Sequence, residues 1–244
     1  MRNMLDQNPL GFALAWIGTY VVSFGLADGL SASFGVEKLI TAPVGLVLVW
    51  VLLRWLKGQG LWAEYGLKKG KLSWRVSLGY LPLVLMASTN LWGGMTLRYS
   101  VAESVLYVVS MVCVGILEEV IFRGLLFRTL CRENLPMAVA VSSITFGVGH
   151  IVNLFTGAQL LATLLQICYA TGAGFLFTVL FLRSGSLIPC IATHILINSL
   201  SAFAEEQSAA MELLTAGVLT VVAAGYGLWI WKANDADKRE ENGK

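Results

Sequence analysis

The stretch Val114-Gly115-Ile116-Leu117-Glu118-Glu119-Val120-Ile121-Phe122-Arg123 places three charged side chains inside an otherwise apolar segment. That segment, 101–127, has the length and hydrophobicity of a membrane-spanning helix. One carboxylate or guanidinium at the centre of such a helix costs about 2.5–3.5 kcal/mol even on lenient insertion scales. Three of them within a turn and a half of helix are therefore tolerated only if they compensate one another or carry out a function.

The whole chain has the composition of a membrane protein. It contains 244 residues, of which 57% are hydrophobic and only 13% are charged, and its mean hydropathy is +0.72. A soluble domain has about a quarter charged residues, so the depletion of charge is the more informative deviation. The net charge of +2 is too small to indicate a nucleic-acid partner, and we expect none.

Eight apolar stretches predict an all-α, polytopic membrane bundle of about eight transmembrane helices. Most of them approach the ~20 residues that are needed to cross the hydrocarbon core. The first is longer than the apolar core of a signal peptide, so we expect it to be a retained helix. We interpret 1–231 as a single membrane domain and 232–244 as a charged cytoplasmic tail. The eight stretches run approximately over 9–28, 39–56, 76–97, 101–127, 137–155, 158–182, 187–204 and 211–231.

The distribution of basic residues predicts the orientation of these helices. If the N-terminus is cytoplasmic, nearly all of the 17 Lys and Arg residues fall in cytoplasmic segments. Only Lys38 and Arg98 then lie on the opposite side, and Arg123 lies within a helix. This asymmetry follows the positive-inside rule, and an odd number of helices would destroy it. The sequence therefore predicts that both termini are cytoplasmic.

The register of the charged stretch separates the three charges by role. Glu119 and Arg123 are one helical turn apart on the same face, where they can form a buried ion pair. Glu118 is rotated by about 100° towards a neighbouring face and has no such partner nearby in the sequence. We therefore expect Glu118 to be the carboxylate that is left without a neutralising charge.

The chain has two histidines, and both lie inside predicted helices. His150 follows Phe146 by one turn, and His194 precedes Asn198 by one turn. At ~1.5 Å per residue, both imidazoles can reach the depth of Glu118, slightly towards the cytoplasmic side. Glycines at 147 and 149 would let another helix or a substrate backbone approach His150.

The four cysteines show no CxxC spacing, which disfavours a disulfide framework or a cysteine metal site. We interpret them as small apolar fillers. They are Cys113, Cys131, Cys168 and Cys190.

Three elements, Glu118-Glu119-xxx-Arg123, Phe146-xxx-His150 and His194-xxx-Asn198, resemble the signature of a family of membrane proteases. This is the CaaX-protease and bacteriocin-processing family (CPBP, or Abi), which includes the Ras-converting CaaX prenyl endopeptidases. The resemblance covers approximately 100–205, the catalytic core. Outside that core the helices match only as generic membrane helices.

The resemblance implies a glutamic intramembrane endopeptidase that uses neither a metal nor another cofactor. Glu118 would activate water, His150 would help to hold that water, and His194 with Asn198 would stabilise the oxyanion. Supporting positions of the site would be Glu119, Arg123 and Phe146. The short chain is similar to bacterial members, which implies a bacterial cell membrane and membrane-associated proteins or peptides as substrates.

Three alternatives stay open on the residues alone. Two histidines and a glutamate can form a catalytic zinc site, although the spacing is not HExxH. The chain could instead be a non-catalytic membrane scaffold that regulates a signalling or envelope partner. Intramembrane Glu and His also occur in proton-coupled transporters, but no second polar half of the kind that transporters repeat is present.

Overall fold

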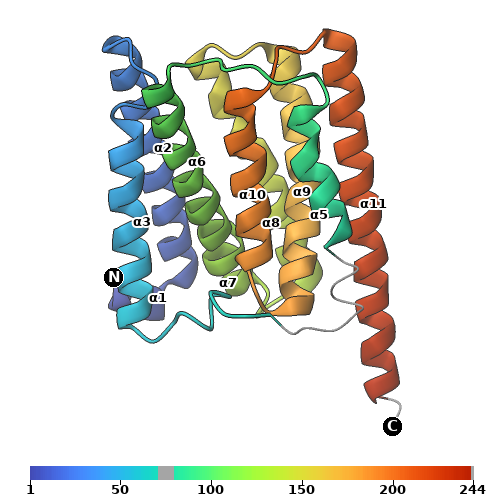
Figure 1. The fold of residues 1–244 in the computed structure, drawn as a ribbon. Helices are drawn as coiled ribbons and strands as arrows, with labels where there is room; N and C mark the ends of the chain where they lie inside the picture. Colours follow the sequence, from blue (N-terminus) through green and yellow to red (C-terminus); the bar gives the residue numbers. More distant parts are fainter. Residues whose placement is uncertain (71–79, 243–244) are drawn as a thin grey trace.

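The computed structural model describes residues 1–70 and 80–242, except for the side chains of Thr156 and of 234–242. Among these residues the chain forms a bundle of helices that run side by side (Figure 1), and the only β-type pairing is an isolated bridge between Met95 and Ala204. The all-α membrane bundle predicted from the sequence is therefore confirmed.

Each of the eight predicted stretches coincides with a helix, and six of these helices are long and apolar enough to cross a membrane. The two shorter ones correspond to the third and seventh predicted stretches, and part of the third lies outside the described residues. The long helices are α2 (Pro9–Ser33), α3 (Thr41–Gly58), α6 (Val101–Glu118) continued by η2 (Glu119–Phe127) and α7 (Arg128–Leu130), α8 (Leu135–Gly149) continued by η3 (His150–Thr156), α9 (Leu160–Ser184) and α11 (Ala209–Asn242). The shorter ones are α5 (Leu81–Ser88) with η1 (Thr89–Leu91) and α10 (Ile188–Leu200) with η4 (Ser201–Phe203), and a one-turn helix α1 (Arg2–Gln7) precedes the bundle.

Local sequence signals set the ends of the helices that carry the polar residues. Ser100 and Glu103 form a reciprocal capping box at the start of α6. The Asn134 side chain accepts a hydrogen bond from the Met137 amide at the start of α8, where a proline occupies the first turn. Gly185 ends α9 in the left-handed conformation, with φ +70°, and α10 begins three residues later.

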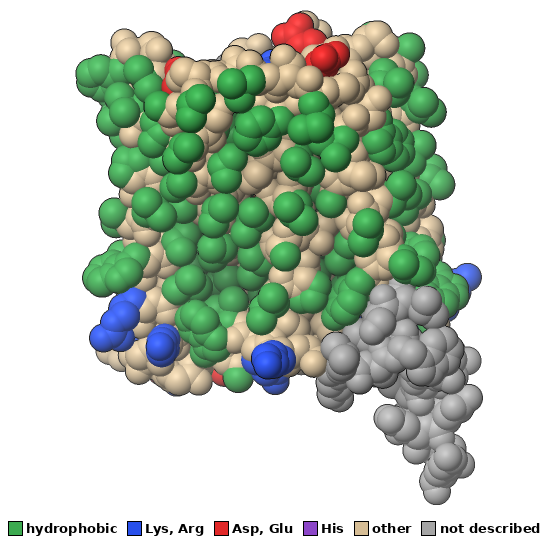
Figure 2. Space-filling model, in the orientation of Figure 1, with side chains coloured by type: hydrophobic (Ala, Val, Ile, Leu, Met, Phe, Trp, Pro, Cys, Tyr) green, Lys and Arg blue, Asp and Glu red, His purple; other side chains and the backbone are tan. Residues whose placement is uncertain are grey.

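The face of the bundle seen in Figure 2 is an apolar belt, with charged side chains at its two ends. Large apolar side chains such as Trp50, Leu26 and Val221 are two-thirds exposed or more, which suits contact with lipid rather than water. Lys and Arg gather at one end, where α1 and the end of α11 also lie (Figures 1 and 2). That the basic end faces the cytoplasm stays a prediction.

The interior is built around α9 and the continuous helix formed by α6, η2 and α7. Half or more of the apolar window of each is buried, against about a third or less for the other long helices. Small residues allow the close approach at two crossings. A Cβ at Gly115 would lie 2.7 Å from Ile195 of α10, and a Cβ at Gly147 would lie 2.8 Å from the Ile167 carbonyl of α9.

Replacing Gly147 with alanine is therefore expected to destabilise the protein by about 1–3 kcal/mol, because α8 and α9 must separate. Gly149→Ala is the matched control, since no heavy atom lies within 4 Å of the position its Cβ would take. Unfolding in detergent measures both variants. Equal stability of the two would contradict the proposed helix contact. The structure thus places α9 close to Gly147, whereas the approach of another group to His150 stays a prediction.

Candidate active site

The ion pair predicted between Glu119 and Arg123 is present and lies in the interior of the bundle. Arg123 Nη1 donates to Glu119 Oε1 at 3.0 Å, and both side chains are 0% exposed. Two charges so far from solvent are tolerated because each neutralises the other in a medium of low dielectric constant. The pair therefore fixes the polar side of η2 inside an otherwise apolar core.

The backbone that carries this pair is a π-helix, which the sequence analysis did not predict. All nine residues of η2 are buried, so the wider turn lies in the middle of the packed core. The hydroxyl of Ser142, on α8, donates to the Phe122 carbonyl within this segment at 3.0 Å. π-helical turns are rare and are frequent at functional sites. Here the turn begins at Glu119, directly after Glu118.

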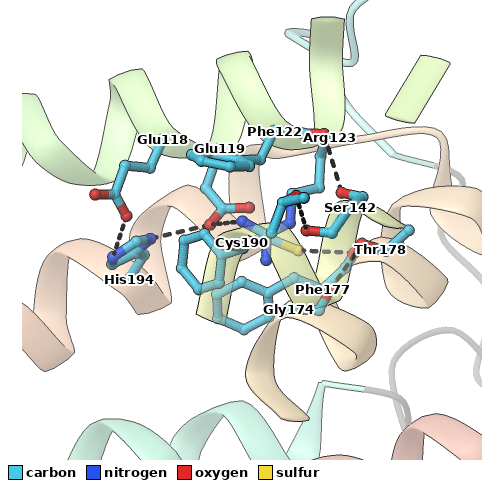
Figure 3. A network of polar contacts seen from close by, with 12 residues as sticks. Glu118, Glu119, Phe122, Arg123, Ser142, Gly174, Phe177, Thr178, Cys190 and His194 are labelled. Atoms are coloured by element: carbon cyan, nitrogen blue, oxygen red, sulfur yellow. Dashed lines mark hydrogen bonds and ion pairs between the residues drawn. The ribbon is translucent and has the colours of Figure 1, made fainter. Parts of the chain in front are cut away.

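His194 joins both glutamates into one network (Figure 3). Its Nδ1 lies 2.9 Å from Glu119 Oε1, and its Nε2 lies 3.6 Å from Glu118 Oε2. Because Glu119 Oε1 also accepts from Arg123, this oxygen is the centre of the network. The close approach of α10 to Gly115 of α6 brings His194 within reach of both carboxylates.

A contact that sequence reasoning missed comes from the first membrane helix. The Tyr20 hydroxyl, on α2, donates a hydrogen bond to Glu118 Oε1. The second oxygen, Glu118 Oε2, accepts no hydrogen bond from the described residues. Tyr20 therefore holds one side of the carboxylate and leaves the other side able to accept a proton. The only indication of this contact in the sequence was that Tyr20 places a hydroxyl in the middle of an apolar helix.

Phe146 is the surface against which the charged and aromatic groups pack. The Arg123 guanidinium lies over its ring, 4.0 Å from the centroid, which adds a cation–π contact to the ion pair. The rings of His150 and His194 meet its edge at centroid distances of 5.3 and 5.7 Å. Gly174 makes room for this cluster, since a Cβ there would lie 3.0 Å from Arg123 Nη2.

His150 and Asn198 lie near this network without joining it. His150 is at the end of α8, where its Nδ1 pairs with the Phe146 carbonyl at 3.0 Å. A neutral imidazole that donates through Nδ1 presents Nε2 as an acceptor. Asn198 is half-buried one turn beyond His194, and no hydrogen bond links its side chain to another described residue. Both side chains thus keep polar atoms that can bind a substrate or a water molecule.

The zinc alternative requires several metal-binding side chains to point at one position. Among the described residues, no three His, Cys, Asp or Glu side chains are grouped so that they could hold one metal ion. His194 directs one nitrogen to each glutamate, and Arg123 competes for Glu119 Oε1. The four cysteines are free thiols, and Cys190 Sγ makes only a weak contact with the Phe177 carbonyl at 3.7 Å.

Comparison with known proteins finds a similarity in the segment that carries most of this network. Residues 100–200 match the model of a family described as type II CAAX prenyl endopeptidase Rce1-like. The chain is also similar to "Putative membrane peptidase YdiL" of Bacillus subtilis (strain 168), at 28% identity over 127 residues, which are 48% of this chain and 48% of that protein. The chain thus aligns with about half the length of this curated relative, and no solved structure matches it. The segment 100–200, which contains Glu118, His150 and His194, is therefore similar to the Rce1-like family of type II CAAX prenyl endopeptidases.

Proposed function

We propose that this protein is an intramembrane endopeptidase that hydrolyses peptide bonds of membrane-associated peptides or proteins. The observation that carries the proposal is the environment of Glu118. Its carboxylate is 13% exposed, is held on one oxygen by Tyr20 and presents the other oxygen to the imidazole of His194. A carboxylate so placed, in the segment that matches a peptidase family, is suited to act as a general base.

In the proposed reaction, Glu118 takes a proton from a water molecule while the water oxygen attacks the carbonyl carbon of the peptide bond. The Nε2 lone pair of His150 would accept the second hydrogen of that water and orient it. When the tetrahedral intermediate collapses, Glu118 returns the proton to the leaving amine. The products are a carboxylic acid and a free amine. The reaction consumes only water and the peptide and needs no oxidant or reductant.

The oxyanion would be stabilised by the two polar groups on α10. Asn198 can offer its amide N–H bonds, which are not committed to other described side chains. His194 donates through Nδ1 to Glu119, so an additional Nε2–H donor makes the ring an imidazolium. The carboxylates of Glu118 and Glu119, one beside each ring nitrogen, would stabilise that charge. Glu119 would therefore support the oxyanion site through His194, and Arg123 would hold Glu119 in place.

Tyr20→Phe is expected to lower kcat about tenfold or more at nearly unchanged KM, because Glu118 loses the donor that orients it. Hydrogen bonds to charged groups contribute about 1.5–3 kcal/mol, and each ~1.4 kcal/mol corresponds to a factor of ten. Tyr107→Phe is the control, since the Tyr107 hydroxyl pairs with Ser201 outside the network. Steady-state cleavage in detergent, with the thermal midpoint of each variant, measures the effect. Wild-type kcat in Tyr20→Phe would contradict a positioning role.

Metal independence is the second expected result. Purified protein treated with a strong zinc chelator is expected to retain its full cleavage rate, because the proposed reaction is carried out by side chains alone. Elemental analysis of the same sample should find less than one zinc per chain. Chelator-sensitive activity that zinc restores would instead support the zinc hydrolase considered from the sequence.

We also propose that the basic end of the bundle faces the cytoplasm, as the positive-inside rule indicates. Both termini would then be cytoplasmic, and the protein would be a multi-pass component of a bacterial cell membrane. The apolar belt in Figure 2 supports the membrane location, and the bacterial relative supports the type of organism. Cysteine labelling of intact cells, at positions introduced near Arg98 and near Arg54, tests the orientation directly.

A further inference from the structure

A cavity of about 170 Å³ lies at the basic end of the bundle, away from Glu118. Its walls come from α1, the start of α2, the segment after α3, and α7 with the residues that follow it. The polar side chains that line it are Arg2, Arg128 and Arg132, together with Asp6, Glu64 and Tyr65. The proposed peptidase reaction uses none of these residues.

The charges around the cavity do not balance. Arg2 pairs with Asp6 at 3.0 Å, and Arg132 pairs with Glu64 at 3.2 Å. Arg128 has no acidic partner among the described residues, and its buried Nε makes no hydrogen bond. Its guanidinium lies over the Phe181 ring at 4.7 Å, a contact that leaves the donor edges free. The lining therefore retains one net positive charge.

Tyr65 adds a neutral hydroxyl to this site. Burial, and then the nearby Glu64 carboxylate, raise the pKa of Tyr65, and Arg132, Arg2 and Arg128 only partly oppose the rise. The phenol therefore stays protonated at neutral pH and can donate a hydrogen bond. Its ring is buried and packs against Gly124 of η2, so its position is set by the helix that carries Arg128.

Apolar side chains are exposed on the short helix that lines the cavity. Met1, which precedes α1, and Met4 on α1 are 51% and 42% exposed, whereas Leu5 is buried. A short helix with exposed apolar residues and charged neighbours, next to a bundle end rich in Lys and Arg, suits the interface between acyl chains and headgroups. Phosphate groups are the most abundant anions at that depth.

We propose that this cavity binds a phosphate group, either the phosphodiester of a phospholipid headgroup or free phosphate. Guanidinium groups bind phosphate oxygens through two parallel N–H bonds, and the Arg128 guanidinium lines the cavity without an acidic partner among the described residues. A phosphodiester carries one negative charge and would neutralise the one positive charge of the lining. Bound phosphate would join α1 and the segment after α3 to the end of the helix that carries Glu118 and Glu119.

The test uses the full-length protein, purified in an uncharged detergent and depleted of lipid. Phosphatidylglycerol, diacylglycerol and inorganic phosphate are added separately, and native mass spectrometry counts the bound molecules while the thermal midpoint is followed. We expect one saturable phosphatidylglycerol site, which Arg128→Gln weakens at least about tenfold. Arg54→Gln removes the same charge from an exposed position at the same end of the bundle and is expected to bind within about twofold of wild type.

Comparison of phosphatidylglycerol, diacylglycerol and inorganic phosphate identifies the source of the phosphate group. Saturable binding of phosphatidylglycerol alone identifies a lipid site, whereas equal stabilisation by inorganic phosphate identifies a soluble ligand, and both support the proposal. Stabilisation by diacylglycerol equal to that by phosphatidylglycerol would overturn it, as would unchanged binding by Arg128→Gln. Should Arg128→Gln fail to fold, Arg132→Gln and Arg128→Lys are measured instead, and wild-type affinity in both would equally overturn the proposal.

Discussion

Replacing Glu118 with glutamine is expected to reduce peptide cleavage by about 10²–10⁴-fold, the contribution of a general base to a reaction of this kind. Glutamine has the same shape and can still accept the hydrogen bond from Tyr20, so the fold and the position of the side chain are kept. It cannot take a proton from water. Cleavage rates of equal amounts of purified wild type and variant in liposomes measure the effect.

Glu212→Gln is the matched control for this variant. Glu212 is exposed in the first turn of α11 and takes part in no described ion pair, so its loss should leave the cleavage rate unchanged. Equal thermal midpoints for all three proteins would show that the loss of activity is chemical. A Glu118→Gln variant that cleaves at the wild-type rate would contradict the assignment of Glu118 as the base.

Replacing Glu119 with glutamine is expected to have the largest effect on folding, about 3–5 kcal/mol, because it leaves the Arg123 charge buried without compensation. Both side chains are 0% exposed, so water cannot replace the lost carboxylate. The same change also replaces the charged acceptor of His194 Nδ1 with a neutral amide. Reversible unfolding in mixed detergent, or the level of folded protein in the membrane, measures the loss.

The double variant Glu119→Gln with Arg123→Met separates electrostatics from packing. It removes both charges while keeping volume in the core, so it should be more stable than Glu119→Gln alone. Its activity should remain low, because His194 still lacks a carboxylate partner at position 119. If Glu119→Gln were as stable as wild type, the buried ion pair would not be holding this part of the structure.

Much of the fold could be predicted because membrane helices are recognised by the hydrophobicity of consecutive residues. The eight stretches, the bundle and the pairing of Glu119 with Arg123 all follow from residues that are near one another in the sequence. The short length of the helix at Leu81–Ser88 could not be predicted in the same way. Residues 92–98 are apolar enough to extend it, but they form a loop that pairs with the segment after α10.

The contacts within the site were harder to predict from the sequence, because they join helices that are far apart in the chain. Tyr20 lies 98 positions from Glu118, and no periodicity in either helix connects them. The π-helix after Glu118 was also missed, because it contains no proline to interrupt an ordinary helix. His194 was expected near Glu118, yet its shorter contact is with Glu119. That contact gives Glu119 a role beyond neutralising Arg123.

A peptidase differs from the two non-proteolytic alternatives in what each requires of Glu118. A scaffold needs the fold but not the carboxylate of Glu118. The Glu118→Gln variant would then fully replace the wild-type protein in cells that lack it. A transporter would move a solute across proteoliposomes that contain the wild-type protein. The peptidase requires neither result, and it alone predicts new peptide ends.

Comparison of the membrane-associated peptides of cells that contain wild type or Glu118→Gln, at equal membrane levels, is the most direct test. The proposed function predicts a set of cleavage products that are present with wild type and absent with Glu118→Gln, with the uncleaved precursors accumulating. Glu212→Gln should give the wild-type pattern. Identical peptides in all three cell types would contradict the claim that Glu118 and its neighbours form a proteolytic centre.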